Sequence, residues 1–439
     1  MTNQDGTDER LTALERQGNY FSRYMQMQAL SSAYLAYANR NLQLEARKKS
    51  ELALSSRPIR VLYYVFLLDQ LNYPLVDALQ ANSEFELQLL AHTPDQVVFL
   101  RERGHRAGLI HSKYELHPEY CEPTVLGFDP DIVFAEMPYA NLPALEESIR
   151  PWMISGNWLP KYTDIFPLSV LNSALFCMVH YGYFIANAWL WLKANPDLNP
   201  HYGLPYPNFS WLYFLESEDH LKYAQSANIW GNTSNYVVTG YPKYDVYLKH
   251  PVKPKSFTWK YSPDQRQRVV YAPHFARSDA FLERTCTTLL ELADTDRFEI
   301  VFKPHPNYNR IVDRYAPMFA EHRNTHTVRN GDCSQYIFAT ADIAIISSVS
   351  MHADGLFSGN PYISELSVDN FNHIGREVWE AAYKLDEGST LNEILTNVLI
   401  KRKDPKKEMR ETLRARLLPK GGAAVENIIL AVLARLGRV

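Results

Sequence analysis

The sequence lacks the short motifs that mark several large enzyme classes. No Gly-x-Gly-x-x-Gly follows the first strand-like stretch, and no Walker lysine loop, Gly-x-Ser-x-Gly elbow or His-Glu-x-x-His pair occurs. The four cysteines are scattered, without Cys-x-x-Cys or zinc-type Cys/His spacing. Asp129-Pro130-Asp131 has the spacing of a metal-binding Asp-x-Asp, but its proline and the strand after it are typical of a plain turn. We therefore expect no cofactor, no metal site and a metal-independent reaction.

An excess of basic residues is also missing. The formal net charge is −4 and the isoelectric point is about 6.4. A broad nucleic-acid footprint needs a basic excess, so nucleic acid is not an expected partner. Scattered cysteines and a polar N-terminus, which does not resemble a signal peptide, predict a cytoplasmic protein.

The chain has no uninterrupted apolar run of membrane-spanning length. Residues 168–192 are long enough, but Asn172, His180 and Asn187 interrupt them and Pro167 precedes them. A buried strand, a turn and an aromatic helix explain this stretch better. Aromatic residues are abundant instead, at 13% with 28 tyrosines. Tyrosine combines an apolar ring with a polar tip, so it suits cores, interfaces and stacking on sugars or bases.

The length predicts two or three domains. We expect an N-terminal helical extension over residues 1–56, because residues 10–54 lack Pro, have no Gly after Gly18 and are rich in helix formers. Its simplest role is packing on the rest of the protein. Homo-oligomer formation through these helices is one alternative. Docking on a membrane surface, to which Arg47-Lys48-Lys49 would contribute, is another.

Strand-like and helix-like stretches alternate through the remainder, which is typical of parallel sheets built from βαβ units. The pattern predicts an α/β fold with a Rossmann-like domain over residues 57–248, a polar linker over 249–267, a second Rossmann-like domain over 268–420 and a C-terminal helix within 421–439. The expected strands are 59–66, 85–92, 129–136, 175–179, 211–215 and 236–239 in the first domain, and 268–271, 298–302, 325–328, 343–346 and 362–364 in the second.

Polar residues follow several strands of the second domain, and ligands of open α/β sheets collect at the carboxyl ends of strands. The candidates are Lys303, His305, Ser347, Ser348, Ser350, His274, Arg277 and Glu365. Prolines on both sides hold His305 in a fixed direction. Together with the ammonium group of Lys303, it could neutralise a diphosphate leaving group.

The other candidates of this domain have more than one reading. Ser348 and Ser350 precede the helix expected at 351–357, where they either cap the helix or donate hydrogen bonds to an anion. The local pattern does not decide between the two. Arg277 could make a forked phosphate contact, and Glu365 could hold a ribose.

The first domain offers candidates for proton transfer. His180 follows an apolar strand and could take a proton from an acceptor hydroxyl, although a single His is more often structural. Glu136, at the end of the third strand, is a rival base. Tyr139 lies in the loop just beyond it and could contact the acceptor.

Several motifs occur in a characteristic order: Asp129-Pro-Asp-Ile-Val-Phe, His180-Tyr-Gly, Gly240-Tyr-Pro-Lys-Tyr-Asp245, Tyr271-Ala-Pro-His-Phe, Lys303-Pro-His-Pro and Ala341-Asp-Ile-Ala-Ile-Ile-Ser-Ser. In this order the chain resembles the CDP-glycerol glycerophosphotransferases, which are the teichoic-acid-type polymerases and their capsule-polymer relatives. The resemblance spans roughly residues 60–390. His-Tyr-Gly stands where the family has His-Gly-Thr, so a nucleotide sugar stays open as an alternative donor.

The resemblance implies a GT-B fold, in which two Rossmann-like domains face a cleft, with the helix 423–436 near the domain junction. It implies an acceptor domain first and a nucleotide-donor domain second. The family's catalytic, donor-binding and phosphate-binding residues correspond to, or lie near, His180, Arg277, His305, Ser348, Ser350 and Asp354.

The function implied is that of a transferase. It would move a glycerophosphate-type or glycosyl group from a nucleotide-activated donor, CDP-glycerol or a nucleotide sugar, to a hydroxyl of a cell-surface polymer or its lipid-linked precursor. Peripheral contact with the inner face of the cell membrane would fit such an acceptor. The alternatives are a nucleotide-sugar glycosyltransferase of capsule or O-antigen synthesis, and a non-catalytic scaffold in a polymer-assembly complex.

Overall fold

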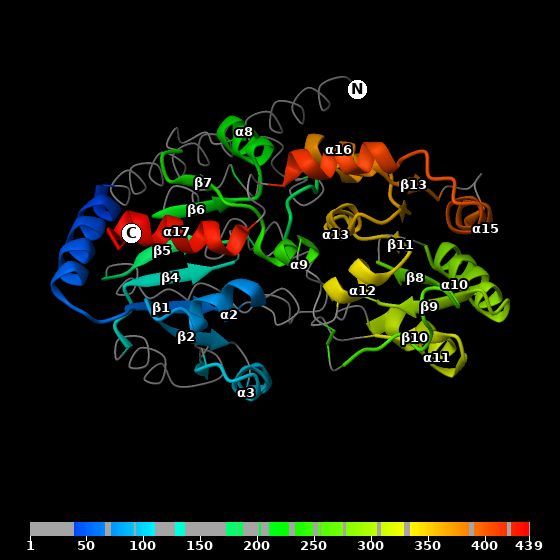
Figure 1. Ribbon diagram of the computed structural model, residues 1–439, viewed down its shortest axis with the longest axis horizontal. Coiled ribbons are helices and arrows are strands. Elements are labelled where there is room, and N and C mark those ends of the chain that lie inside the picture. Colours follow the sequence, from blue (N-terminus) through cyan, green and yellow to red (C-terminus); the bar gives the residue numbers. More distant parts are fainter. Residues whose placement is uncertain are drawn as a thin grey trace, which may run out of the picture.

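The structure, a computed structural model, consists of two halves, each built on one parallel sheet (Figure 1). It describes residues 39–65, 72–91, 94–109, 128–136, 173–180, 182–187, 202, 210–227, 233–248, 253–254, 256–274, 278–304, 309–328, 334–385, 390–418 and 423–438. In both halves the strands run toward the junction between them, so their carboxyl ends gather there.

The first half contains a seven-stranded sheet with the order β3-β2-β1-β4-β5-β6-β7. Its strands are β1 (Ile59–Tyr64), β2 (Phe85–Ala91), β3 (Ala107–Leu109), β4 (Ile132–Ala135), β5 (Leu175–Met178), β6 (Leu212–Leu215) and β7 (Tyr236–Val238). Its helices are α2 (Tyr73–Ala81), α3 (Pro94–Glu102), α8 (Glu218–Ala227), the short 3₁₀ turn η6 (Pro242–Tyr244) and α9 (Asp245–Leu248). Every expected strand is present; β3, only three residues long, was not expected.

The second half contains a six-stranded sheet with the order β10-β9-β8-β11-β12-β13. Its strands are β8 (Gln267–Ala272), β9 (Phe298–Phe302), β10 (Thr325–Thr327), β11 (Ile343–Ile346), β12 (Tyr362–Ser364) and β13 (Tyr383–Lys384). Its helical elements are α10 (Asp279–Asp294), α11 (Asn309–Glu321), α12 (Ser334–Thr340), α13 (Met351–Ser358), η8 (Val368–Asn370), α14 (His373–Ala381), α15 (Leu391–Leu395), η9 (Thr396–Ile400) and α16 (Lys407–Leu417). In both sheets the first strand in sequence lies inside the sheet, the next two strands follow on one side of it, and the later strands follow on the other side. This shared strand order confirms the predicted pair of Rossmann-like units.

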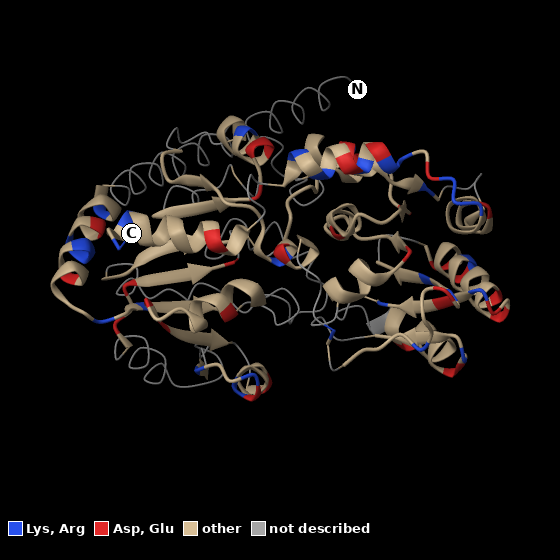
Figure 2. Cartoon of the chain, in the orientation of Figure 1, with Lys and Arg blue, Asp and Glu red and all other residues tan. Residues whose placement is uncertain are grey.

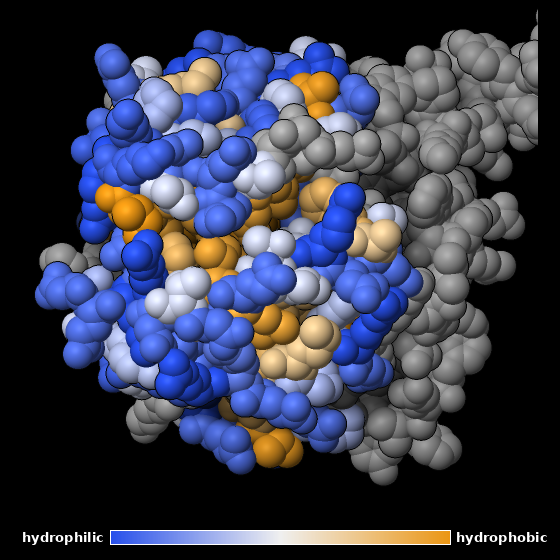
Figure 3. Space-filling model, turned by 90° about the vertical axis from the view of Figure 1, so that its right-hand side faces the viewer, coloured by the Kyte–Doolittle hydropathy of each residue, from blue (hydrophilic) through white to orange (hydrophobic). Residues whose placement is uncertain are grey.

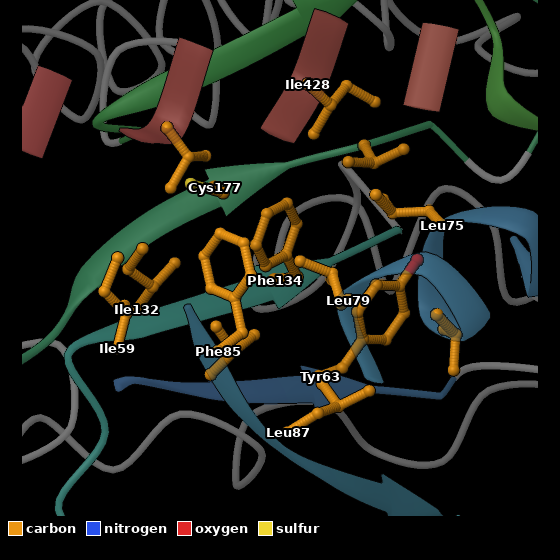
Figure 4. Close-up of a cluster of buried hydrophobic side chains, with 14 of the residues drawn as sticks. Ile59, Tyr63, Leu75, Leu79, Phe85, Leu87, Ile132, Phe134, Cys177 and Ile428 are labelled. Carbon is orange, nitrogen blue, oxygen red and sulfur yellow. The ribbon is translucent and has the colours of Figure 1, made fainter. Parts of the chain in front are cut away.

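The strands of the first sheet are apolar on both sides because helices or loops cover both faces. Alternate residues point to opposite faces: Tyr63 and Phe134 lie in one core, whereas Leu62 and Val133 lie in the other. Figure 4 shows the first of these cores, in which Tyr63 and Phe134 stack with ring centroids 5.7 Å apart. Strands buried on both faces read as continuous apolar runs, which is why their positions could be predicted.

The C-terminal helix corrects one expectation. We expected it near the domain junction, but α17 (Ala424–Leu436) returns to the first half, where its buried face joins the core around β1 and β4. Figure 4 shows Ile428 of this helix above that core. Only its first turn lies at the junction, where the Asp245 carboxylate accepts hydrogen bonds from the backbone N–H groups of Ala424 at 2.8 Å and Val425 at 2.9 Å. The apolar face of α17 requires burial, and the first sheet supplies the surface.

Residues 39–54 form a helix that packs on the first half, with Leu44 and Leu52 buried. Lys48 and Arg57 both donate to the Asp131 carboxylate, at 2.9 and 2.6 Å. The turn that resembles a metal motif thus anchors this helix. Residues 1–38, on which the oligomer and membrane-docking alternatives also depend, lie outside the described residues.

Aromatic residues from both halves form one continuous core at the junction. Tyr183 and Tyr244 contact the ring of Phe357 in α13, with centroids 5.2 and 4.5 Å apart. The expected linker also takes part, because Phe257 and Trp259 are buried in the same core. The polar, Pro-rich composition of residues 249–267 predicted a linker, and the burial of Phe257 and Trp259 was not expected.

Figure 2 shows that Lys, Arg, Asp and Glu lie mainly on the helices and loops around the two sheets, whereas most of the strands carry few of them. Lysines, arginines and glutamates alternate along α16, and Arg416 on this helix contacts Asp219 of α8 at 3.1 Å and Glu377 of α14 at 2.7 Å, which ties the halves together. Figure 3 shows the end face of the second half, where hydrophilic residues surround apolar ones. Within the described ranges, no helix combines the length and apolarity that crossing a bilayer requires.

The closest approach of the two halves predicts a steric limit at Gly375 in α14. A Cβ added there would lie 2.1 Å from the carbonyl oxygen of Ile185. Alanine favours a helix by about 1 kcal/mol over glycine, but overpacking against backbone costs about 1–3 kcal/mol. We therefore expect Gly375→Ala to lower the free energy of unfolding, measured by urea denaturation followed by circular dichroism and tryptophan fluorescence.

Gly182→Ala is the matched control, since nothing lies within 4 Å of a Cβ at that position and Gly182 has no positive φ. If Gly375→Ala were as stable as Gly182→Ala, the close contact between the halves would be wrong.

Candidate functional site

Glu136 lies where β4 ends, beside β1, at the point where the strand order of the first sheet reverses. Ligands of such sheets bind at this switch point. Its Oε1 accepts hydrogen bonds from the Tyr63 hydroxyl at 2.8 Å, the Asn72 backbone N–H at 2.9 Å and Nδ2 of Asn72 at 3.0 Å. Burial raises the pKa of Glu136 to about 7, against the opposing effects of the Lys243 charge and these hydrogen bonds. A carboxyl with this pKa is suited to proton transfer near neutral pH.

His180 follows β5, and Glu216 follows the neighbouring strand β6; both are buried. Nδ1 of His180 lies 2.6 Å from Oε1 of Glu216. Burial alone would raise the pKa of Glu216, but the charges of His180 and His220 and the hydrogen bond from His180 outweigh it and hold the pKa at about 2. Glu216 is therefore ionised and only accepts, which places the hydrogen of this contact on Nδ1. Nε2 of His180 has no hydrogen-bond partner among the described residues.

The second half brings its predicted polar residues to the carboxyl ends of its strands. Lys303 follows β9 and is buried, Ser347 follows β11, and Glu365 follows β12. The hydroxyl of Ser347 donates to Oε2 of Glu365, and that of Thr285 donates to Oε1 at 3.3 Å. Both Glu365 oxygens are thus engaged inside the protein, so a ribose would share an acceptor that already has partners.

The serine loop departs from one expectation. Ser350 precedes α13, but its side chain makes no capping hydrogen bond, since its backbone is already helical. Its hydroxyl lies 3.4 Å from that of Ser348. His352 holds the loop instead: its Nδ1 donates to the Ser348 carbonyl at 2.8 Å, and its Nε2 meets the Ser364 hydroxyl at 2.7 Å. Of the two readings of these serines, the helix cap is therefore wrong for Ser350.

Two lysines connect the halves electrostatically. Lys243 lies in η6 of the first half and Lys303 in the second, and both are buried. Burial raises the pKa of Asp354 to about 6, against the opposing effects of a hydrogen bond from Tyr247 and the charges of both lysines. The Tyr247 hydroxyl lies 2.8 Å from Oδ1 of Asp354. The Lys243 charge also lowers the pKa of Glu136, so it acts on carboxyls of both halves.

Three sequence candidates, Tyr139, Arg277 and His305, lie outside the described residues. His274 is half-buried just after β8. Sequence reasoning missed Glu216, Lys243 and His352. Glu216 and Lys243 each follow a strand closely, which is the signal that could have found them. In the described part of the chain, no three His, Cys, Asp or Glu side chains form a group that could hold a metal ion.

Comparisons with known proteins show the fold. No family model and no curated protein matches the chain. The wall teichoic acid polymerase TagF is similar in structure, with 14% identity, a TM-score of 0.58 and coverage of 93% of this chain and 98% of that one. S. aureus MnaA with UDP is also similar, with 12% identity, a TM-score of 0.56 and coverage of 87% of this chain and 98% of that one. So is the UDP-GlcNAc 2-epimerase from Neisseria meningitidis bound to UDP-GlcNAc, with 13% identity, a TM-score of 0.55 and coverage of 86% of this chain and 100% of that one. The chain thus has the expected GT-B fold.

The raised pKa of Glu136 predicts a pH-dependent stability difference. Between about pH 4.5 and 7 the folded protein binds more protons at Glu136 than the unfolded chain does, so its ionisation destabilises the fold as the pH rises through this window. We expect Glu136→Gln to raise the free energy of unfolding at pH 8 by about 1–3 kcal/mol, and the difference to vanish near pH 4.5. Urea denaturation at a series of pH values measures it.

For Glu216→Gln we expect the opposite change, a lower free energy of unfolding. The pKa of Glu216 is lowered from 4.5 to about 2, so its ionisation stabilises the fold above pH 4.5, and this stabilisation is lost as the pH falls toward 2. This variant should be less stable than wild type at pH 8. A Glu136→Gln variant no more stable than wild type at pH 8 would contradict the environment described for Glu136.

Proposed function

We propose that the protein is a transferase that moves a glycerophosphate-type or glycosyl group from a nucleotide-activated donor to an acceptor hydroxyl. The observation that carries this proposal is the His180–Glu216 pair at the carboxyl ends of β5 and β6. Ionised Glu216 only accepts hydrogen bonds, so it orients the His180 ring through Nδ1, and Nε2 has no hydrogen-bond partner among the described residues. In this proposal Nε2 takes the proton of the acceptor hydroxyl. A carboxylate that orients a histidine base is a recurring arrangement in enzymes that activate hydroxyl groups.

The second half supports binding of the donor. Lys303 and Ser348 lie at the carboxyl ends of strands, where a phosphate group of the donor would bind. Ser347, whose hydroxyl donates to Glu365, would act there by holding that carboxylate. Lys243 adds a second cation from the opposite half. His305, Arg277 and His274 complete the donor site in this proposal. Asp354, whose pKa the charges of both lysines lower, belongs to the same cluster. Tyr139 belongs to the acceptor side.

The reaction proceeds in one direct step. The acceptor hydroxyl oxygen bonds to the reacting atom of the donor, which is phosphorus for a glycerophosphate group or the anomeric carbon for a sugar. Nε2 of His180 takes the hydroxyl proton. The bond to the nucleotide phosphate breaks, its electron pair leaves with the nucleotide, and Lys303 and Lys243 stabilise the charge. The step needs neither a metal ion nor a cofactor.

The similar structures support this proposal through their ligands and activities. One is a wall teichoic acid polymerase, and two hold UDP or UDP-GlcNAc. We therefore propose a cell-surface polymer or its lipid-linked precursor as acceptor, with the protein at the cytoplasmic face of the membrane. CDP-glycerol and a nucleotide sugar are the two donor candidates; the latter would make the protein a glycosyltransferase of surface-polysaccharide synthesis.

Nucleotide binding separates an enzyme from a scaffold in a polymer-assembly complex. A thermal-shift screen with CMP, CDP, UDP, GDP, CDP-glycerol and UDP-sugars should find at least one nucleotide that raises the melting temperature, since a ligand at 100 times its Kd stabilises by about 2.7 kcal/mol. Lys303→Met should weaken the diphosphate about 10- to 100-fold, because it removes a charge-assisted contact. The exposed Lys401→Met is the control. The absence of any nucleotide effect on wild type would favour the scaffold.

The identity of the base can be tested with His180→Ala. Loss of a general base typically lowers the rate about 100- to 10,000-fold, so kcat should fall by this factor while KM for the donor stays within about twofold. Nucleotide release from CDP-glycerol or UDP-GlcNAc measures both constants. His322→Ala, whose ring pairs with Asp294 on the second half, is the control. If Glu136→Gln lost far more activity than His180→Ala, Glu136 would be the base instead.

A further inference from the structure

Of the aromatic rings that contact His180, those of Tyr202 and Tyr213 belong to the first half alone, whereas Phe184 is held from both halves of the protein. The Phe184 ring lies 4.2 Å from the His180 ring, centroid to centroid. The Phe184 carbonyl oxygen accepts a hydrogen bond from Nε2 of His220 at 3.2 Å and another from Nδ2 of Asn372 at 2.9 Å. His220 belongs to α8 of the first half, whereas Asn372 precedes α14 of the second. The backbone beside His180 therefore depends on a side chain from the opposite half.

Other contacts fix the direction of the Asn372 amide. Its Oδ1 accepts from the Gly375 backbone N–H at 2.8 Å and caps α14. Its own backbone N–H donates to the Ile185 carbonyl at 3.0 Å. Because Oδ1 of Asn372 accepts the hydrogen bond from α14, its Nδ2 points the other way and donates to the Phe184 carbonyl oxygen. Ala186 and Phe371 form an antiparallel bridge beside it, so two short segments are docked strand to strand.

The docked segment also contacts the residue that holds the serine loop. The Phe371 ring lies 4.9 Å from the His352 ring, and His352 donates to the Ser348 carbonyl. The segment of Phe371 and Asn372 thus contacts both the residue that holds the serine loop, through Phe371, and the loop that carries His180, through Asn372. Both contacts involve buried groups.

We propose that Asn372 is a positioning residue for the base: by holding the Phe184 carbonyl it keeps the Phe184 ring against His180, and so keeps the His180 ring aligned with Glu216. The base site is then incomplete without the second half. This inference rests on the proposed function, in which His180 takes the acceptor proton. Asn372 itself touches no reacting atom.

One substitution isolates the contact. Asn372→Ser keeps a hydroxyl that can cap α14 and keeps the backbone N–H to Ile185, but its side chain carries no amide to reach Phe184. Asn187→Ala is the matched control. It removes a hydrogen bond from Nδ2 of Asn187 to the Asp369 carbonyl, 3.0 Å long, on the same border between the halves. It leaves Phe184 untouched.

The first measurement does not depend on activity. With ¹⁵N-labelled histidine, the ring nitrogens of the 14 histidines are observed by NMR, and the signal missing in His180→Ala identifies His180. In Asn372→Ser the ring-nitrogen signals of His180 should shift away from their wild-type positions, because the contact between Nδ1 and Glu216 is disturbed. In Asn187→Ala they should not move. Unchanged His180 signals in Asn372→Ser, or equal shifts in both variants, would overturn the proposal.

The second measurement asks whether the effect passes through His180. Nucleotide release from CDP-glycerol and UDP-GlcNAc should show kcat lowered about 10-fold by Asn372→Ser, since small misplacements of reacting groups cost this much or more, with KM for the donor unchanged. In the His180→Ala background the same substitution should cause no further loss. An equal loss in both backgrounds contradicts the proposal. If wild type releases no nucleotide, the proposed function fails, and the ring spectrum alone decides the role of Asn372.

Discussion

The site depends on how the two halves are joined. Each half has its own parallel sheet, and each sheet has a core on one face whose residues come from that half alone. What brings their carboxyl ends together is the aromatic core around Tyr183, Tyr244 and Phe357, reinforced where residues 184–187 meet residues 369–375. At Gly375 the segments lie so close that a Cβ would clash with the Ile185 carbonyl oxygen, which explains the glycine there. Because the residues assigned to the site come from both halves, a change in this contact would alter how they face one another.

A buried lysine also links the two halves at this junction. A lysine removed from water needs carboxylates nearby, and the charge of Lys243 acts on Glu136 in one half and Asp354 in the other. Burial raises the pKa of both carboxyls well above the ordinary range. Replacing buried charges with apolar residues of similar size is often neutral or stabilising, so a buried charged cluster is a candidate ligand site. In the function proposed above, the diphosphate of the donor would lie between Lys243 and Lys303.

Much of this could be predicted from sequence because it depends on local pattern. Continuous apolar runs located the strands, and the strand ends located Glu136, His180, Lys303 and Ser347. The rest depends on contacts between distant segments. Glu216 lies 36 positions after His180, and no spacing rule pairs them. The packing of α17 on the first sheet likewise could not be predicted, because its apolar face could pack on either half.

The buried histidines among the described residues differ in how their ring nitrogens are paired. Nδ1 of His105 hydrogen-bonds Gln80, and its Nε2 lies 3.4 Å from the Asp77 carboxylate. His220 and His352 have both ring nitrogens within hydrogen-bond distance of a hydroxyl or carbonyl oxygen, as buried polar groups normally do. His180 is equally buried, yet in the part of the chain that the structure describes only its Nδ1 is paired. Leaving a buried polar atom unpaired costs about 1–3 kcal/mol. The proposed role of His180 requires such an unpaired Nε2, since a group that takes a proton from a hydroxyl must be able to meet that hydroxyl.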